Sequence, residues 1–155
     1  MMQRIMKYAA LLLCTVLCAS AAEPIVGTWL LKSQQIAGQE RNSRPLTLRI
    51  TQSGDVLQFE YSVMVNQKQE ISMRFAARID GPEAEVKDPA GRKIGTAKLS
   101  RFGASQYLVM LEGPNRPTSA GRMTLSNGGK TLTSEADASV PNGAKTHTTQ
   151  VFERQ

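Results

Sequence analysis

The sequence predicts an all-β protein, a single up-and-down antiparallel β-barrel of about eight to ten strands. Apolar and polar residues alternate at spacing two, which is typical of strands with one buried face. Turn residues recur at close to the ~8–12 residue spacing of sandwiches and barrels. A chain of consecutive hairpins leaves its first and last strands unpaired, and closing the sheet removes both edges. Closure therefore favours a barrel.

The alternation and the turn residues together place the strands. We expect them at residues 26–33, 46–52, 56–65, 70–79, 93–101, 105–112, 119–126, 130–138 and 145–154. Between them stand segments such as Ser53-Gly54-Asp55 and Asn127-Gly128-Gly129, in which Gly and Asn supply positive φ. Residues 34–45 have no clean period, and both a loop and a short helix remain open there.

The hairpin at residues 56–79 has two possible registers that keep the apolar faces matched. Pairing Tyr61 with Met73 leaves the three-residue loop Asn66-Gln67-Lys68 and places Glu60 opposite Arg74. Pairing Tyr61 with Phe75 instead leaves the loop Gln67-Lys68-Gln69. A solvent-side ion pair between Glu60 and Arg74 would contribute only ~0.2–1 kcal/mol in either case.

The N-terminus has the pattern of a secretory signal peptide. Arg4 and Lys7 precede a short apolar run, and small residues follow at 19–22. We expect a signal peptide over residues 1–22 and one domain over residues 23–155, in the periplasm or secreted. The apolar run is shorter than the ~20 residues of a membrane-spanning helix. Bulky Leu17 before Cys18 disfavours a lipoprotein.

Cleavage before Glu23 would change the composition of the chain. Both cysteines, Cys14 and Cys18, would leave with the peptide, so the mature protein would have no disulfide and no thiol chemistry. The formal net charge would fall from +6 to about +4. No cluster of Lys and Arg is interleaved with aromatic residues, so nucleic acid is not an expected partner.

Trp29 and Arg154 are candidates for closing the barrel. Trp29 is the only tryptophan and begins the first strand, while Arg154 shares a strand face with Phe152 in the last strand. We predict that the Arg154 guanidinium lies over the Trp29 ring, a contact that contributes roughly 0.5–2 kcal/mol. The alternative is an ordinary core tryptophan and a solvated Arg154 at a frayed end.

No combination of residues predicts catalysis, a metal or a cofactor. The one histidine, His147, lies on the face opposite Phe152 and is expected to be a solvated strand residue. Glu83, Glu85 and Asp88 cluster between two prolines, and we expect a solvated loop rather than an acid–base pair. The sequence therefore favours a protein that is not an enzyme.

Two functional hypotheses remain, and they differ in which face of the barrel acts. In the first, inward residues line a pocket for a small, mostly apolar ligand. These residues are Phe59, Tyr61, Val63, Met73, Phe75, Tyr107, Val109 and Leu111. The same residues could instead fill a solid core. The alternative function is then an interaction or inhibitor module that meets an anionic envelope surface through basic residues. These are Lys87, Arg92, Lys93, Lys98 and Arg101.

Gly27-Thr28-Trp29 resembles the Gly-x-Trp signature of the calycins, the superfamily of lipocalins, fatty-acid-binding proteins and avidins. Residues 130–133 and 148–154 resemble the last hairpin of that group. The mature chain is also similar to small exported bacterial lipocalin-like proteins, mostly uncharacterised, at residues 95–99, 119–122 and 127–132. The resemblance implies a barrel in which Arg154 packs on Trp29. It does not imply biotin binding, which needs several tryptophans, nor the Arg-x-Tyr carboxylate clamp of fatty-acid-binding proteins, which this sequence lacks.

Overall fold

A computed structural model of the protein describes residues 21–42, 44–114, 116–139 and 143–155. The predicted signal peptide lies outside the described residues except for Ala21 and Ala22, and Cys14 and Cys18 lie outside them as well. The signal peptide and the cleavage site therefore stay predictions.

The described residues form one antiparallel sheet and a single 3-10 turn, η1 (Asn127–Gly129). The strands are β1 (Gly27–Ile36), β2 (Gln39–Glu40), β3 (Leu46–Ser53), β4 (Val56–Val65), β5 (Lys68–Arg78), β6 (Ala84–Lys87), β7 (Lys93–Gly103), β8 (Gln106–Gly113), β9 (Arg116–Ser126), β10 (Thr131–Ser139) and β11 (Lys145–Arg154).

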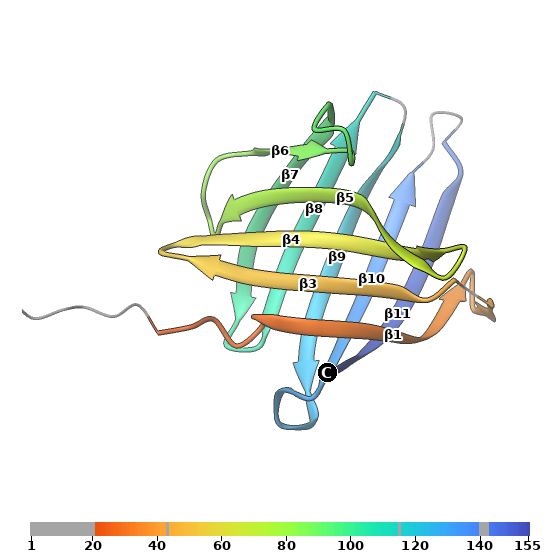
Figure 1. Cartoon of the computed structure of the whole chain (residues 1–155), viewed down its shortest axis with the longest axis horizontal. Coiled ribbons are helices and arrows are strands. Elements are labelled where there is room, and N and C mark those ends of the chain that lie inside the picture. The colour runs from red at the N-terminus through yellow and green to blue at the C-terminus, as the bar shows by residue number, and fades with distance from the viewer. Residues whose placement is uncertain (1–20, 43, 115, 140–142) are drawn as a thin grey trace, which may run out of the picture.

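Pairing of the first and last strands closes the sheet into a barrel. The order runs from β11 down to β3 and then to β1, and β1 pairs back with β11 from Trp29–Arg154 to Ile36–Thr148. The two-residue β2 pairs with β1 alone, so the other ten strands close the barrel. Strands β3 to β5 cross in front of β7 to β11 (Figure 1). The predicted up-and-down β-barrel is confirmed.

Two short strands were not expected from the sequence. The segment left open at 34–45 continues β1 to Ile36 and then forms β2. The other is β6, which holds Ala84 and Val86 on the inner side but is only four residues long. Its alternation is too short to stand out between Pro82 and Pro89. The expected solvated loop at 83–88 is therefore wrong for Glu85, which lies in β6, and for Asp88, which is 8% exposed.

The β4–β5 hairpin adopts the first of the two predicted registers. Tyr61 pairs with Met73, and Glu60 lies opposite Arg74. The loop, however, is the two-residue turn Asn66-Gln67, because the register shifts by one residue after Tyr61. Both turn residues have positive φ, 47° and 63°, as the right-handed twist of a two-residue hairpin turn requires.

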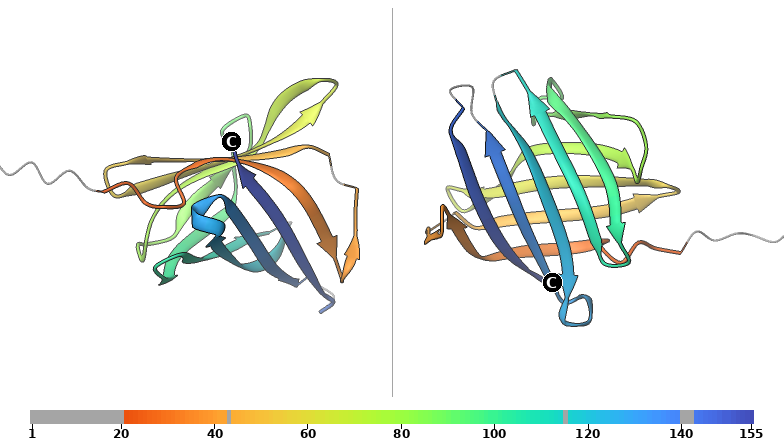
Figure 2. Two further views of the ribbon diagram at one scale, coloured as in Figure 1. Left: turned by 90° about the horizontal axis from the view of Figure 1, so that it is seen from below. Right: turned by 180° about the vertical axis from the view of Figure 1, so that it is seen from behind.

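The two ends of the barrel differ in how tightly they are filled. The closed end carries the β3–β4, β5–β6, β7–β8 and β9–β10 connections together with both described termini (Figure 2). The mouth is the opposite end, where the β1–β3, β4–β5, β6–β7, β8–β9 and β10–β11 connections lie. Along the inner face of β4, Leu57 and Phe59 near the closed end are at most 1% exposed, while Tyr61 and Val63 towards the mouth are half-buried.

Candidate functional site

The closed end is sealed by Arg154 and Trp29. The guanidinium carbon of Arg154 lies 4.3 Å from the centre of the Trp29 ring, so the predicted stacking is present. Three guanidinium nitrogens also donate to backbone carbonyls, Nε to Gly129 at 2.8 Å, Nη1 to Val26 at 2.6 Å and Nη2 to Pro24 at 2.7 Å. A Cβ on Gly27 would lie 2.5 Å from Arg154 Nη1. The glycine of the Gly-x-Trp signature therefore makes room for the arginine.

Glu23 makes a second seal beside the first. The Tyr107 hydroxyl donates to Glu23 Oε2 at 2.9 Å, and Arg101 forms an ion pair with the same oxygen. The backbone N–H of Glu23 donates to Gln52 Oε1 at 2.7 Å. Burial, and then the hydrogen bond to Glu23, raise the pKa of Tyr107 to about 12. The Tyr107 hydroxyl is thus occupied at the closed end and does not face the mouth.

Towards the mouth, apolar side chains leave part of the interior open. Leu46, Tyr61, Met73 and Leu111 pack against the core but stay half-buried. A cavity of about 360 Å³ opens beside Leu111 and is bordered mainly by apolar surface. The residues around it are Val86, Ile94, Gly95, Leu111, Glu112, Ser119 and Ala138. A Cβ on Gly95 would collide with the Glu112 carbonyl, so a glycine is required where β7 and β8 approach closely.

Tyr61 supplies a polar group on the apolar wall of the mouth. Desolvation by burial raises the pKa of its phenol above the ordinary range, which keeps the group neutral. Among the described residues its hydroxyl has no hydrogen-bond partner, although no buried side-chain polar atom there is left unsatisfied. The hydroxyl therefore reaches solvent-accessible space and is free to donate to a bound molecule.

The structure divides the eight predicted ligand-contacting residues between the two halves of the barrel. Phe59, Phe75, Tyr107 and Val109 lie in the solid half and are at most 4% exposed. The Phe59 and Phe75 rings stack on each other with centroids 4.6 Å apart. Tyr61, Val63, Met73 and Leu111 are the members that lie towards the mouth and remain half-buried. Their role in ligand binding stays a prediction.

A polar wall that was not predicted from the sequence faces the mouth from the last strands. The inward positions of β10 and β11 above the buried pair Leu132–Phe152 carry polar and small residues. They are Ser134, Ala136, Ala138, Thr146, Thr148 and Gln150. The alternation that marks β11 continues through them, but with Thr and Gln where other strands have Val or Leu. The period-two spacing of these inward residues was therefore visible in the sequence, but their polar side chains gave no indication that they face the interior.

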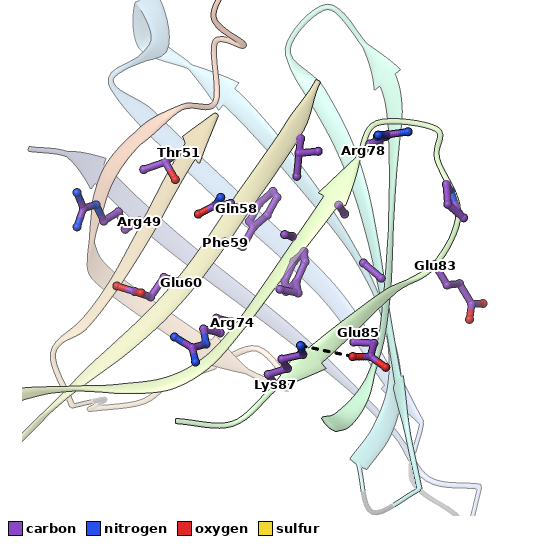
Figure 3. A pocket seen from close by; sticks show the side chains of 16 residues that line it. Arg49, Thr51, Gln58, Phe59, Glu60, Arg74, Arg78, Glu83, Glu85 and Lys87 are labelled. Carbon is purple, nitrogen blue, oxygen red and sulfur yellow. Dashed lines mark ion pairs between the residues drawn. The ribbon is translucent and has the colours of Figure 1, made fainter. Parts of the chain in front are cut away.

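A second, larger cavity of about 780 Å³ opens on the outer side of the barrel wall where β5 and β6 separate, and it reaches inward to Phe59 and Phe75 of the core (Figure 3). These two strands pair only at Arg74–Lys87. Arg49, Glu60 and Arg74 form a row across β3, β4 and β5, and Figure 3 shows their side chains at the edge of the cavity. Lys87 lies 3.6 Å from Glu85, a carboxylate that it shares with Lys93. The outer cavity therefore has mixed charge.

Three local carboxylates balance part of the charge of the basic segment that was predicted to meet an anionic surface. Arg92 pairs with Asp88 at 2.7 Å, Lys93 and Lys87 both lie 3.6 Å from Glu85, and Arg101 binds Glu23. Hydrogen bonds from Arg92 lower the pKa of Asp88 and fasten the β6–β7 turn. Lys98 is the member of this segment with no ion pair among the described residues. These contacts favour a structural role for most of the segment.

His147 lies on the outer face of β11, as the sequence predicted. Its Nδ1 is 2.7 Å from Asp137 Oδ1 across the β10–β11 pair, and its Nε2 is 3.4 Å from Thr149 Oγ1. The side chains of His147 and Asp137 are 52% and 75% exposed, so bulk water surrounds the group. No cluster of three or more potential metal-ligating residues occurs in the described part of the chain.

The comparisons with known proteins support the barrel fold. No model of a protein family matches the sequence, and no curated protein matches it. Zebrafish ileal bile acid-binding protein complexed with cholic acid is similar, with a TM-score of 0.56, 16% identity, and coverage of 85% of this chain and 99% of that one. The REP1-NXSQ fatty acid transporter has a TM-score of 0.57, 18% identity, and coverage of 86% and 100%.

A third similar structure is an abundant heat soluble (SAHS) protein from Ramazzottius varieornatus, with a TM-score of 0.63 and 10% identity. The match covers 86% of this chain and 97% of that chain. At these identities the likeness concerns the fold. Within the described residues, no helix has the length and hydropathy needed to cross a membrane.

Proposed function

We propose that the protein is an exported lipocalin-like barrel that binds a small, mostly apolar ligand at its mouth, without catalysis. The observation that carries this proposal is the difference in side-chain packing between the two ends of the barrel interior. The closed half is packed solid, while inward-facing apolar residues at the mouth remain half-buried beside a cavity of about 360 Å³. A pocket of this size and lining is typical of small-molecule sites.

Burial of apolar surface would supply most of the affinity, at roughly 25 cal/mol per Å². The free hydroxyl of Tyr61 would orient the ligand. Similar barrels include one bound to cholic acid and one named as a fatty acid transporter, which supports ligand binding in this architecture. Export is supported by the signal-peptide pattern of residues 1–22 alone.

The test compares two neighbouring residues of β8. Leu111 borders the cavity, while Met110 is 37% exposed and points outward. A tryptophan at Leu111 would fill the cavity, and the same change at Met110 would leave it open. We expect Leu111→Trp to weaken uptake of the neutral probe N-phenyl-1-naphthylamine at least ten-fold, and Met110→Trp to leave it unchanged. Probe fluorescence measures the binding, and urea unfolding checks that both variants fold.

Two results would contradict the proposal. One is a wild-type protein that takes up neither the probe nor any component of a lipid extract in native mass spectrometry. The other is equal uptake by both tryptophan variants, which would place the probe outside the cavity beside Leu111.

A further inference from the structure

We propose, on the basis of the proposed function, that the mouth selects a neutral ligand with a hydrogen-bonding head, such as an alcohol or an amide, over a carboxylate of equal length. The inference comes from the polar wall on β1, β10 and β11, opposite the apolar wall that holds Tyr61. Towards the mouth, the described inward residues of this wall offer hydrogen-bonding groups and no charge.

The centre of the polar wall is one row of three side chains. Gln34 on β1 pairs with Gln150 on β11, and Gln150 pairs with Ser134 on β10. All three are half-buried, and none of their side chains has a hydrogen-bond partner among the described residues. Two amides and a hydroxyl thus remain available as both donors and acceptors.

The register shows that this row faces the interior. Phe152 and Leu132 are 1% and 0% exposed and pair with each other in the core. Gln150 and Ser134 lie two residues away along the same strands, and successive side chains alternate between the two faces of a sheet. Gln34 follows the shift in β1 between Leu31 and Ser33 and is half-buried, while its neighbour Gln35 is exposed.

The interior of the mouth contains no counter-ion for a buried carboxylate among the described residues. On β1, β10 and β11 the described inward positions above the core are apolar, small or neutral polar. On β5, Glu70 and Lys68 pair with Val63 and Val65 and share their face, and both are exposed near the rim. Arg154 does face inward, but it lies at the closed end with its guanidinium over Trp29 and bound to three carbonyls. A carboxylate held inside would therefore lose hydration without gaining a partner, and this disfavours its charged form.

Cations on the rim could hold a carboxylate outside the barrel with its chain inside. Arg41, Arg44, Lys68 and Lys145 lie in or next to the mouth connections, and all four are exposed. Exposed ion pairs contribute little free energy because water and salt screen them. Their contribution corresponds to less than about a ten-fold change in affinity. The uncharged interior is therefore expected to decide the preference.

The experiment uses three probes with the same ten-carbon chain: decan-1-ol, decanamide and decanoate. Isothermal titration calorimetry of the mature chain at pH 8 measures their affinities. We expect the alcohol and the amide to bind at least ten-fold more tightly than decanoate. Decanoate binding as tightly as the neutral probes would overturn this inference and leave the proposed function standing. Binding of none of the three would overturn both.

Substitutions in the row of Gln34, Gln150 and Ser134 test whether this row determines the preference for a neutral ligand. Gln150→Lys adds an inward cation, and we expect it to reverse the preference in favour of decanoate. Gln34→Leu removes one amide and is expected to weaken decanamide binding about five-fold. Gln35→Leu is the matched control, because Gln35 is the neighbouring glutamine on the outside. Unchanged preference in Gln150→Lys, with urea unfolding showing a folded variant, would remove the row from the site.

Discussion

The closed end and the mouth are built from the same ten strands, yet they hold their side chains in opposite ways. At the closed end, large residues from both crossing layers meet, and Trp29, Phe59, Tyr107 and Phe152 are each at most 1% exposed. At the mouth, apolar residues on one side face Ser, Thr, Gln and Ala on the other. Strand alternation is therefore necessary for a filled core but not sufficient, because the partner across the barrel must be large enough to fill the space.

The two ends also differ in whether their polar side chains have partners within the protein. The closed end uses its polar groups internally, since Arg154 binds three carbonyls and Glu23 binds Tyr107 and Arg101. At the mouth, the inward hydroxyl of Tyr61 and the amides of Gln34 and Gln150 have no partner among the described residues. The polar groups of the closed end thus have hydrogen-bond partners within the protein, whereas those of the mouth are available to a bound molecule or to water.

The largest expected difference between the ends comes from a matched pair of leucines on β3. Leu48 is 0% exposed, and Leu46, two residues nearer the mouth on the same face, is half-buried. Leu48→Ala should lower the free energy of unfolding by about 3–5 kcal/mol, because it leaves a cavity in a packed core. Leu46→Ala should cost no more than about 1–2 kcal/mol. Urea unfolding measures both, and equal losses would mean that the two ends are equally filled.

The seal of the closed end gives a smaller effect. Arg154→Met keeps an apolar contact with Trp29 but removes the three hydrogen bonds to Gly129, Val26 and Pro24. We expect a loss of about 2–3 kcal/mol in urea unfolding, because bonds to charged groups are the stronger ones. Arg41→Met is the control, since Arg41 is exposed near the mouth and should change stability by less than about 0.5 kcal/mol. Similar small losses in both variants would show that Arg154 does not fasten the barrel.

The smallest effect is at alkaline pH. The pKa of Tyr107 is raised to about 12, above the ordinary value of about 10, so folding favours the neutral phenol. This contribution is fully present below about pH 10 and is lost as the pH rises from about 10 to 12. The shift corresponds to at most about 2.7 kcal/mol, which screening by solvent reduces to about 2 kcal/mol or less. Tyr107→Phe should therefore lose less stability than the wild type across that window. Urea unfolding at stepped pH measures this, with tyrosine ultraviolet absorption as the titration check. A wild type and variant that lose stability in parallel would contradict the assignment.

Several features of the fold could be predicted because they depend on residues that are close together in the sequence. The alternation in residues 56–65 predicted β4 with its correct bounds, and the matched faces of the hairpin included the observed Tyr61–Met73 register. The short strand β6 could not be predicted in the same way. Its four residues carry too few alternations, and they are held by pairing with β7 and by the Asp88–Arg92 contact at the following turn.

The sequence alone determined the all-β class and the antiparallel barrel, and it offered the stacking of Arg154 on Trp29 as one of two alternatives, which the structure confirms. Periodicity and the need to remove sheet edges are properties of the chain itself. Only the tertiary structure decided which inward residues are core and which border open space. Phe59 and Tyr61 share one strand face, yet Phe59 meets Phe75 in a stacked pair, while the hydroxyl of Tyr61 meets no partner among the described residues. Whether an inward side chain is buried depends on residues across the barrel, which lie far away in sequence and are brought close by closure.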